Sequence, residues 1–140
     1  MLAQLATVVL LTSLAIVQTP EEEKKAREEE RKTLKESCER GVAADCVRLA
    51  TVYVEGDGVP TDLEEAAKFF EKACDLGHGE ACLALARQRR HGEGVKVDLE
   101  KAAALYEKAC AAGVSTACAE YATALEAGGE VDRHLGRAAE

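Results

Sequence analysis

The sequence predicts an all-α protein, a right-handed α/α solenoid in which a 36-residue unit repeats along the chain. Three observations predict this fold class. Tryptophan is absent, aromatic residues make up 4% of the chain and prolines number 2, which favours helices over an aromatic-rich β-sandwich. Apolar residues recur at helical spacing. The same residue types also recur at a fixed long period, as in helical repeat arrays.

The period is clearest in the cysteines. Their positions fall into two series with a spacing of 36 residues: Cys38, Cys74 and Cys110, then Cys46, Cys82 and Cys118. The same offset relates turn glycines and core positions: Gly41, Gly77 and Gly113; Leu49, Leu85 and Tyr121; Gly56, Gly92 and Gly128. This divides the chain into a segment at 1–18, a charged helix at 19–41, full units at 42–77 and 78–113, and a partial unit at 114–140.

The first 18 residues differ from the rest of the chain. Residues 2–17 carry no charge, and Thr19-Pro20 opens a run of Glu, Lys and Arg. An apolar stretch of about 16 residues is short for a membrane span and typical of a secretory signal. We therefore expect a signal segment at 1–18, cleaved or retained as an anchor. A buried helix is the alternative, since no Lys or Arg precedes the stretch and no clear A-x-A cleavage site follows it.

The segment 19–41 is predicted to be a charged helix. Thr19 and Glu22 fit a capping box, with Pro20 at the first helical position. One interpretation is a solvated helix whose last turns dock on the first repeat. The other is a rigid spacer of about 30 Å, at 1.5 Å per residue, which requires that the apolar segment stays attached.

Each repeat unit is predicted to hold two helices. In the first unit Cys46, Leu49, Ala50 and Tyr53 follow the i, i+3, i+4, i+7 spacing of one helix face, and this helix ends at the glycines of 56–58. A second helix starts after an N-cap at Asp62, with Thr61 as a competing cap, and ends at Gly77. Its apolar stripe comprises Leu63, Ala66, Ala67, Phe70, Ala73 and Cys74.

The later units depart from this pattern. Arg89 occupies the position of Tyr53, which puts a charge where the unit expects an aromatic ring. In the last unit Glu130 replaces the second turn glycine and His134 replaces the capping aspartate, so we expect an irregular turn there.

The repeated pattern resembles a Sel1-like repeat, a relative of the tetratricopeptide repeat. It rests on Leu49-Ala50, Tyr53, the Gly56-Asp57-Gly58 turn, Asp62, Ala66-Ala67, Phe70, Ala73-Cys74 and Gly77. With a cysteine at both ends, the unit resembles the Helicobacter cysteine-rich protein family. That resemblance implies an exported solenoid with one disulfide per repeat, whose first helices line a concave side. It also implies links with penicillin binding and weak β-lactamase activity.

The cysteines are interpreted as disulfides. Zinc ligands are usually two to four residues apart, and the three C-x7-C pairs do not fit that spacing, so we expect no metal site and no cofactor. Each local pair spans a tight turn, where Cα atoms come within the roughly 5 to 6 Å that a disulfide needs. Pairing of Cys46 with Cys74 is an alternative, but it leaves Cys38 and Cys118 without a partner. The local pairing satisfies all six cysteines: Cys38 with Cys46, Cys74 with Cys82, and Cys110 with Cys118.

Disulfides persist only in oxidising compartments, so the cysteines and the apolar start both predict a periplasmic or secreted protein. The net charge of -8 and the pI near 5.0 argue against nucleic acid as a partner. We expect membrane contact only if the apolar segment is retained.

No catalytic residue is predicted. Serine β-lactamase chemistry uses S-x-x-K with S-D-N and K-T-G partners, and the sequence contains none of these motifs. The serines lie in the apolar segment, beside a cysteine or in a turn: Ser13, Ser37 and Ser115. The histidines lie on turns or helix ends, where solvent exposure is the usual state: His78, His91 and His134.

A binding surface is predicted on the first helices of the units. Its positions lie off the core stripe: Arg48, Val52 and Glu55; Ala84, Gln88 and His91; Glu120, Ala124 and Ala127. Beside them, residues 87–91 form a basic segment, in which Arg87 and Arg89 suit a carboxylate of a partner peptide. The alternative is that these arginines pair with neighbouring glutamates and face solvent.

The sequence thus predicts an exported protein- or peptide-binding repeat scaffold without catalysis. Penicillin binding or weak β-lactamase activity is the first alternative, and a degenerate structural fragment is the second. We also expect a tendency to form homo-oligomers. The first helix of the partial unit exposes an apolar face, because little of a second helix follows to cover it: Cys118, Tyr121 and Leu125.

Overall fold

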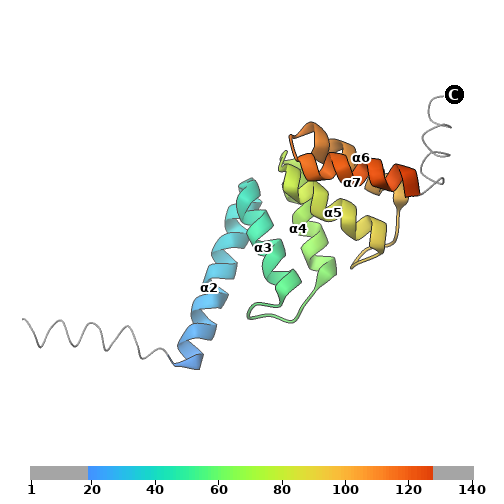
Figure 1. Ribbon diagram of the computed structural model, residues 1–140. Helices are drawn as coiled ribbons and strands as arrows, with labels where there is room; N and C mark the ends of the chain where they lie inside the picture. The colour runs from blue at the N-terminus through green and yellow to red at the C-terminus, as the bar shows by residue number, and fades with distance from the viewer. Residues whose placement is uncertain (1–18, 128–140) are drawn as a thin grey trace, which may run out of the picture.

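The computed structural model describes residues 19–127, and within this range every regular element is an α-helix (Figure 1). The expected all-α class is confirmed. The six helices of this range follow one another through short turns: α2 (Pro20–Glu39), α3 (Ala43–Glu55), α4 (Leu63–Asp75), α5 (Gly79–His91), α6 (Leu99–Ala111) and α7 (Ser115–Ala127).

The helices pair into repeats. α3 packs against α4, α5 packs against α6, and α7 opens a third repeat against α6. We call α3, α5 and α7 the inner helices and α2, α4 and α6 the outer helices. The buried core is rich in alanine and half-cystine, and such small side chains let helix axes approach closely. Its fully buried members include Cys46, Ala50, Ala66, Ala73, Ala81, Ala86 and Ala109.

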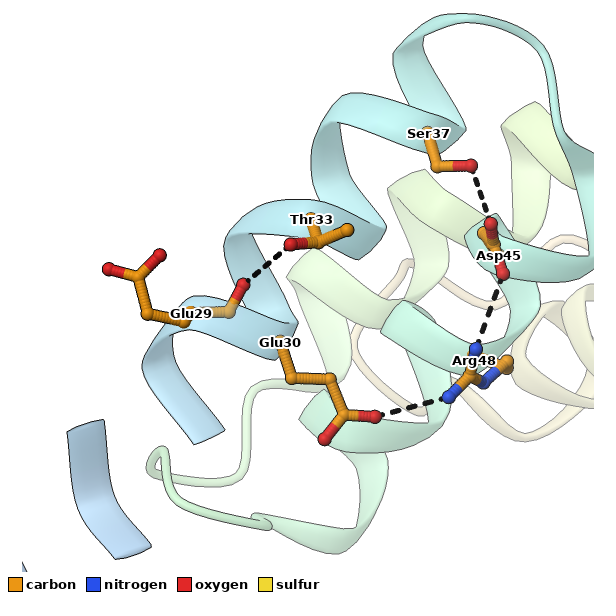
Figure 2. A network of polar contacts seen from close by, with 6 residues as sticks. All are labelled: Glu29, Glu30, Thr33, Ser37, Asp45 and Arg48. Carbon is orange, nitrogen blue, oxygen red and sulfur yellow. Dashed lines mark hydrogen bonds and ion pairs between the residues drawn. The ribbon is translucent and has the colours of Figure 1, made fainter. Parts of the chain in front are cut away.

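The charged helix α2 takes the place of an outer helix in front of the first repeat (Figure 1). Leu34 and Cys38 are its buried residues. Polar contacts tie its last three turns to α3, and Figure 2 shows two of them. The bonds are Ser37 Oγ to Asp45 Oδ2 at 2.5 Å and Arg48 to Glu30 at 3.1 Å.

Docking of α2 also extends towards its N-terminus. Arg27 forms an ion pair of 2.6 Å with Asp57, in the turn that follows α3. Contact therefore runs along the helix from Arg27 to Cys38, further than the last turns that the sequence indicated. Only the stretch before Arg27 is left for a spacer, which is much less than the 20 residues of the helix.

The helix caps follow the sequence closely. Thr19 and Glu22 form the predicted capping box of α2, with Pro20 at its start. The Asp62 and Asp98 carboxylates accept hydrogen bonds from Glu65 N and Lys101 N. The predicted cap of α4 is therefore confirmed, and the equivalent residue 36 positions later caps α6 in the same way. Each cap satisfies a backbone N–H that the helix itself leaves without a partner.

One turn glycine also marks where consecutive repeats meet. Gly94, in the turn between α5 and α6, has φ +72°, and a Cβ atom there would lie 2.4 Å from the backbone carbonyl carbon of Leu63. The turn of the second repeat therefore rests directly on the start of α4 in the first repeat. Only glycine satisfies both the positive φ and the close approach.

The expected signal segment at 1–18 and the irregular turn at Glu130 and His134 lie outside the described residues. Within residues 19–127, no helix combines the length and apolar character that crossing a membrane requires.

Candidate functional site: two faces of the helical array

Three disulfides connect each outer helix to the inner helix that follows it. The bonded pairs are Cys38–Cys46, Cys74–Cys82 and Cys110–Cys118, with Cα atoms 4.7, 4.7 and 4.8 Å apart. These are the local pairs expected from the sequence. The first four cysteines are at most 1% exposed, whereas Cys110 and Cys118 are half-buried. The disulfides fix the angle between consecutive helix pairs and thus the relative placement of surface residues along the array.

The inner helices present one shared solvent-facing surface, which we call the inner face. Positions 36 residues apart carry its partly or fully exposed side chains: Arg48, Ala84 and Glu120; Thr51, Arg87 and Thr123; Glu55 and His91. Six residues of the predicted binding surface and its basic segment lie here: Arg48, Glu55, Ala84, Arg87, His91 and Glu120. The surface is therefore polar, and it extends across three repeats.

Arg87 of α5 and Glu120 of α7 join two repeats on the inner face. Arg87 Nε donates to both carboxylate oxygens of Glu120, at 3.1 and 3.0 Å, and Nη2 donates to Oε1. This bond network lowers the pKa of Glu120 and raises that of Arg87. The Arg87 side chain is 48% exposed and that of Glu120 is 30% exposed. Arg87 therefore has a partner within the chain, as the alternative interpretation of the basic segment held.

Tyr106 of α6 lies beneath this pair. Its side chain is 1% exposed, and burial raises the pKa of its hydroxyl, with Arg90 and Glu120 nearby. The hydroxyl has no hydrogen-bond partner of standard geometry among the described residues. Tyr106 thus places a buried hydroxyl of α6 beside a cation and an anion.

The structure corrects the placement of one predicted binding residue, Gln88. Gln88 is buried, at 5% exposure, and its Nε2 lies 3.4 Å from the carbonyl oxygen of Leu63. Val52, at the equivalent position of α3, is half-buried. Gln88 lies one residue further round the helix than Arg87, a rotation of about 100° that turns it towards α4 and away from solvent.

Arg89 lies on a different face. It is half-buried and lines two adjoining cavities of about 220 and 330 Å³ beside α4, which share Glu71, Leu85 and Arg89. We call their combined lining the outer groove, because it runs between the outer helices α4 and α6 over α5. The predicted basic segment is thus divided between faces, with Arg87 and His91 on one and Arg89 on the other.

Ser37 and His78 have structural roles. Ser37 donates to Asp45, which also faces Arg48 at 3.5 Å, so the serine connects α2 to α3 beside the first disulfide (Figure 2). His78 Nδ1 accepts a hydrogen bond from Ala81 N and caps α5. His91 is exposed at the end of the same helix. Across residues 19–127, no cluster of His, Cys, Asp or Glu has the composition of a metal site.

Together, the paired helices, the 36-residue period and the disulfide in each repeat define a helical repeat solenoid that is covalently fastened between helix pairs. The Sel1 repeat family matches residues 43–78 and 79–114, which is more than half of the 140 residues. The chain belongs to the Sel1 repeat family. Repeat arrays of this kind form extended surfaces for protein–protein interaction.

The solved structures that resemble the chain include three repeat proteins. Helicobacter pylori cysteine rich protein B is 32% identical with a TM-score of 0.64, and the match covers 66% of this chain and 70% of that one. A Sel1 repeat protein from Oxalobacter formigenes is 23% identical with a TM-score of 0.61, covering 67% of this chain and 38% of that one. The third is c5321, a protective antigen present in uropathogenic Escherichia coli strains.

The c5321 structure displays an SLR fold, at 28% identity and a TM-score of 0.66, and the match covers 70% of this chain and 21% of that one. The chain therefore spans well under half the length of the last two proteins. No curated protein sequence matches the chain.

Sequence reasoning missed the Arg87–Glu120 pair, although the repeat contains a signal for it. Glu120 lies 33 residues after Arg87, which is one 36-residue period less one helical turn. Residues related in this way lie side by side on neighbouring inner helices.

Proposed function

We propose that the chain is an exported, non-catalytic scaffold that binds a protein or peptide partner on its inner face. The observation that carries the proposal is the alignment of exposed side chains of α3, α5 and α7 on one surface at a constant period, with Arg87 and Glu120 joined across repeats. The disulfides and the Arg87–Glu120 pair connect the helices that carry this surface. Little of the binding free energy is therefore needed to order the surface when a partner binds.

Export is supported by the cysteine chemistry. All six cysteines of the chain are paired, and such bonds persist in oxidising compartments. A periplasmic or secreted location follows, with residues 1–18 as the proposed signal. Mass spectrometry of the native protein should show a mass six hydrogens below that of the all-thiol chain and a mature N-terminus near residues 18–20. Six free thiols in the native protein would contradict export.

Partner binding is tested by capture from periplasmic or secreted fractions, with the oxidised protein as bait. Arg48→Ala combined with His91→Ala removes two exposed side chains from the inner face. The matched control is Lys24→Ala combined with Lys25→Ala on exposed α2. We expect the first variant to lose captured protein and the control to keep it, with unchanged circular dichroism spectra for both. Equal capture by both variants would place the site elsewhere.

A further inference from the structure

The outer groove repeats with the chain, but its central residue changes. In front of the first repeat, a cavity of about 400 Å³ lies over Leu49 and Tyr53 and beside Lys35 of α2. Residues 36 positions later, Leu85, Arg89 and Glu71, line the two cavities beside α4. The fold therefore forms the same kind of groove twice, and the second one carries a guanidinium where the first one carries a ring.

The ring in the first repeat has a packing role that Arg89 does not reproduce. Tyr53 stacks on Phe69 with ring centroids 5.8 Å apart. The equivalent of Phe69 is Leu105, which lines the cavity beside Arg89. Replacement of the aromatic pair by arginine and leucine leaves an apolar floor at Leu85 and Leu105 with a cation at its centre.

The charge of the outer groove is opposite to that of the protein. Five basic and three acidic side chains line the two cavities: Lys68, Arg89, Lys96, Lys101 and Lys108 against Glu64, Glu71 and Asp75. The whole chain carries -8. Two of the lysines have acidic neighbours, Lys68 with Glu65 at 2.7 Å and Lys108 with Asp75 at 3.9 Å. Among the residues that the structure describes, Arg89 forms no ion pair, although Glu71 lines the same two cavities.

We propose that the outer groove binds an acidic peptide segment of a partner protein, with a carboxylate on Arg89 and an apolar side chain over Leu85 and Leu105. The proposal deepens the proposed function, on which it rests, by assigning a second surface and a partner chemistry. Arginine suits this task because its planar group donates two parallel hydrogen bonds to one carboxylate. The acidic side chains Glu64, Glu71 and Asp75 accept hydrogen bonds from peptide N–H groups.

The size of the groove fits a short extended segment. From Glu64 to Asp75, α4 is about 17 Å long at 1.5 Å per residue. An extended peptide rises about 3.3 Å per residue, so about five residues fill this length. A membrane surface suits the groove less, because the groove is concave, contains three carboxylates and belongs to an acidic protein.

The test uses the full oxidised chain and a fluorescein-labelled peptide, Glu-Glu-Leu-Phe-Glu-Glu, followed by fluorescence anisotropy. We expect Arg89→Tyr, which restores the residue type of position 53, to weaken binding about tenfold, as expected for a lost charge-assisted contact. The matched control is Lys24→Ala on exposed α2, which should bind like the wild type. The uncharged peptide Gln-Gln-Leu-Phe-Gln-Gln should bind at least tenfold more weakly. If Arg89→Tyr fails to fold, Lys101→Ala with Lys96→Ala takes its place.

Amide chemical shifts separate failure of this proposal from failure of the proposed function. Peptide-induced shifts should map to residues 64–75 and 95–108. Shifts on the inner face, sensitive to Arg48→Ala, would overturn the outer groove and leave the proposed function standing. Unchanged binding by Arg89→Tyr, equal binding of both peptides, or no binding of either would also overturn it. So would preferential binding to vesicles of phosphatidylglycerol and phosphatidylcholine, which would indicate a lipid surface instead.

Discussion

The three disulfides close loops of the same length, so their different burial predicts different contributions to stability. Each one joins cysteines 8 residues apart. Loop closure of this length restricts the unfolded chain by about 2.5 kcal/mol at 25 °C in the chain-entropy treatment. This contribution is equal for all three. Any difference between their removals must come from the folded protein.

Packing supplies that difference. Cys74 and Cys82 are 1% exposed, whereas Cys110 and Cys118 are half-buried. Replacing each buried cysteine by alanine leaves a void of about one heavy atom, which costs about 1 kcal/mol. We expect Cys74→Ala with Cys82→Ala to lower the free energy of unfolding by about 4 to 5 kcal/mol. Cys110→Ala with Cys118→Ala should lower it by about 3 kcal/mol.

Urea denaturation followed by circular dichroism at 222 nm measures both values, and hydrogen exchange shows which helices open. The loss for the first pair is a large share of the 5–15 kcal/mol typical of a domain, so α4 and α5 should lose protection against exchange. Equal losses for the two pairs would refute the packing argument. A larger loss for the Cys110–Cys118 pair would show that the end of the array depends on its disulfide more than the core does.

Three further predictions concern single residues. Gly94→Ala should lower the free energy of unfolding by at least about 2 kcal/mol more than Gly77→Ala. The reason is that the new Cβ at position 94 would lie within 3 Å of the Leu63 backbone, whereas nothing lies within 4 Å of a Cβ at position 77. Equal melting temperatures of the two variants would contradict this. The pKa of Glu120 is lowered in the folded state, so its ion pair with Arg87 stabilises the fold at neutral pH and this stabilisation is lost as the pH falls through that pKa. At this exposure the stabilisation is below about 1 kcal/mol. Glu120→Gln should therefore flatten the acid side of a melting-temperature profile, and a profile like that of the wild type would count against the pair. His78→Ala should cost about 1 kcal/mol as a lost N-cap, whereas exposed His91→Ala should cost little in the same urea titration.

Local chemistry explains why much of the fold could be predicted from the sequence. The caps at Thr19, Asp62 and Asp98 depend on groups within three residues, and the spacing of the apolar residues determines which face of each helix is buried. Because the unit repeats every 36 residues, a helix or cap assigned in one repeat is also expected at the equivalent positions of the next repeat. The disulfide pairing follows the same rule, because each bond spans only one turn.

The candidate site depended on contacts between segments that are distant in the sequence. Gln88 and Arg87 are neighbours in the chain, yet Gln88 is buried near the start of α4 and Arg87 meets Glu120 of α7. Arg89 faces a groove that exists only because α4 and α6 both flank α5.

The sequence by itself determined the 36-residue period. It also determined the helices, the caps at Thr19 and Asp62 and the cysteine pairs, because each of these depends on residues within a few helical turns. Only the tertiary structure decided which helix covers each side of α5, and hence how the basic segment divides between the inner face and the outer groove. A rotation of about 100° per residue separates neighbouring side chains. The angles at which neighbouring helices pack then determine whether each side chain lies in solvent, in the core or beside a charged group.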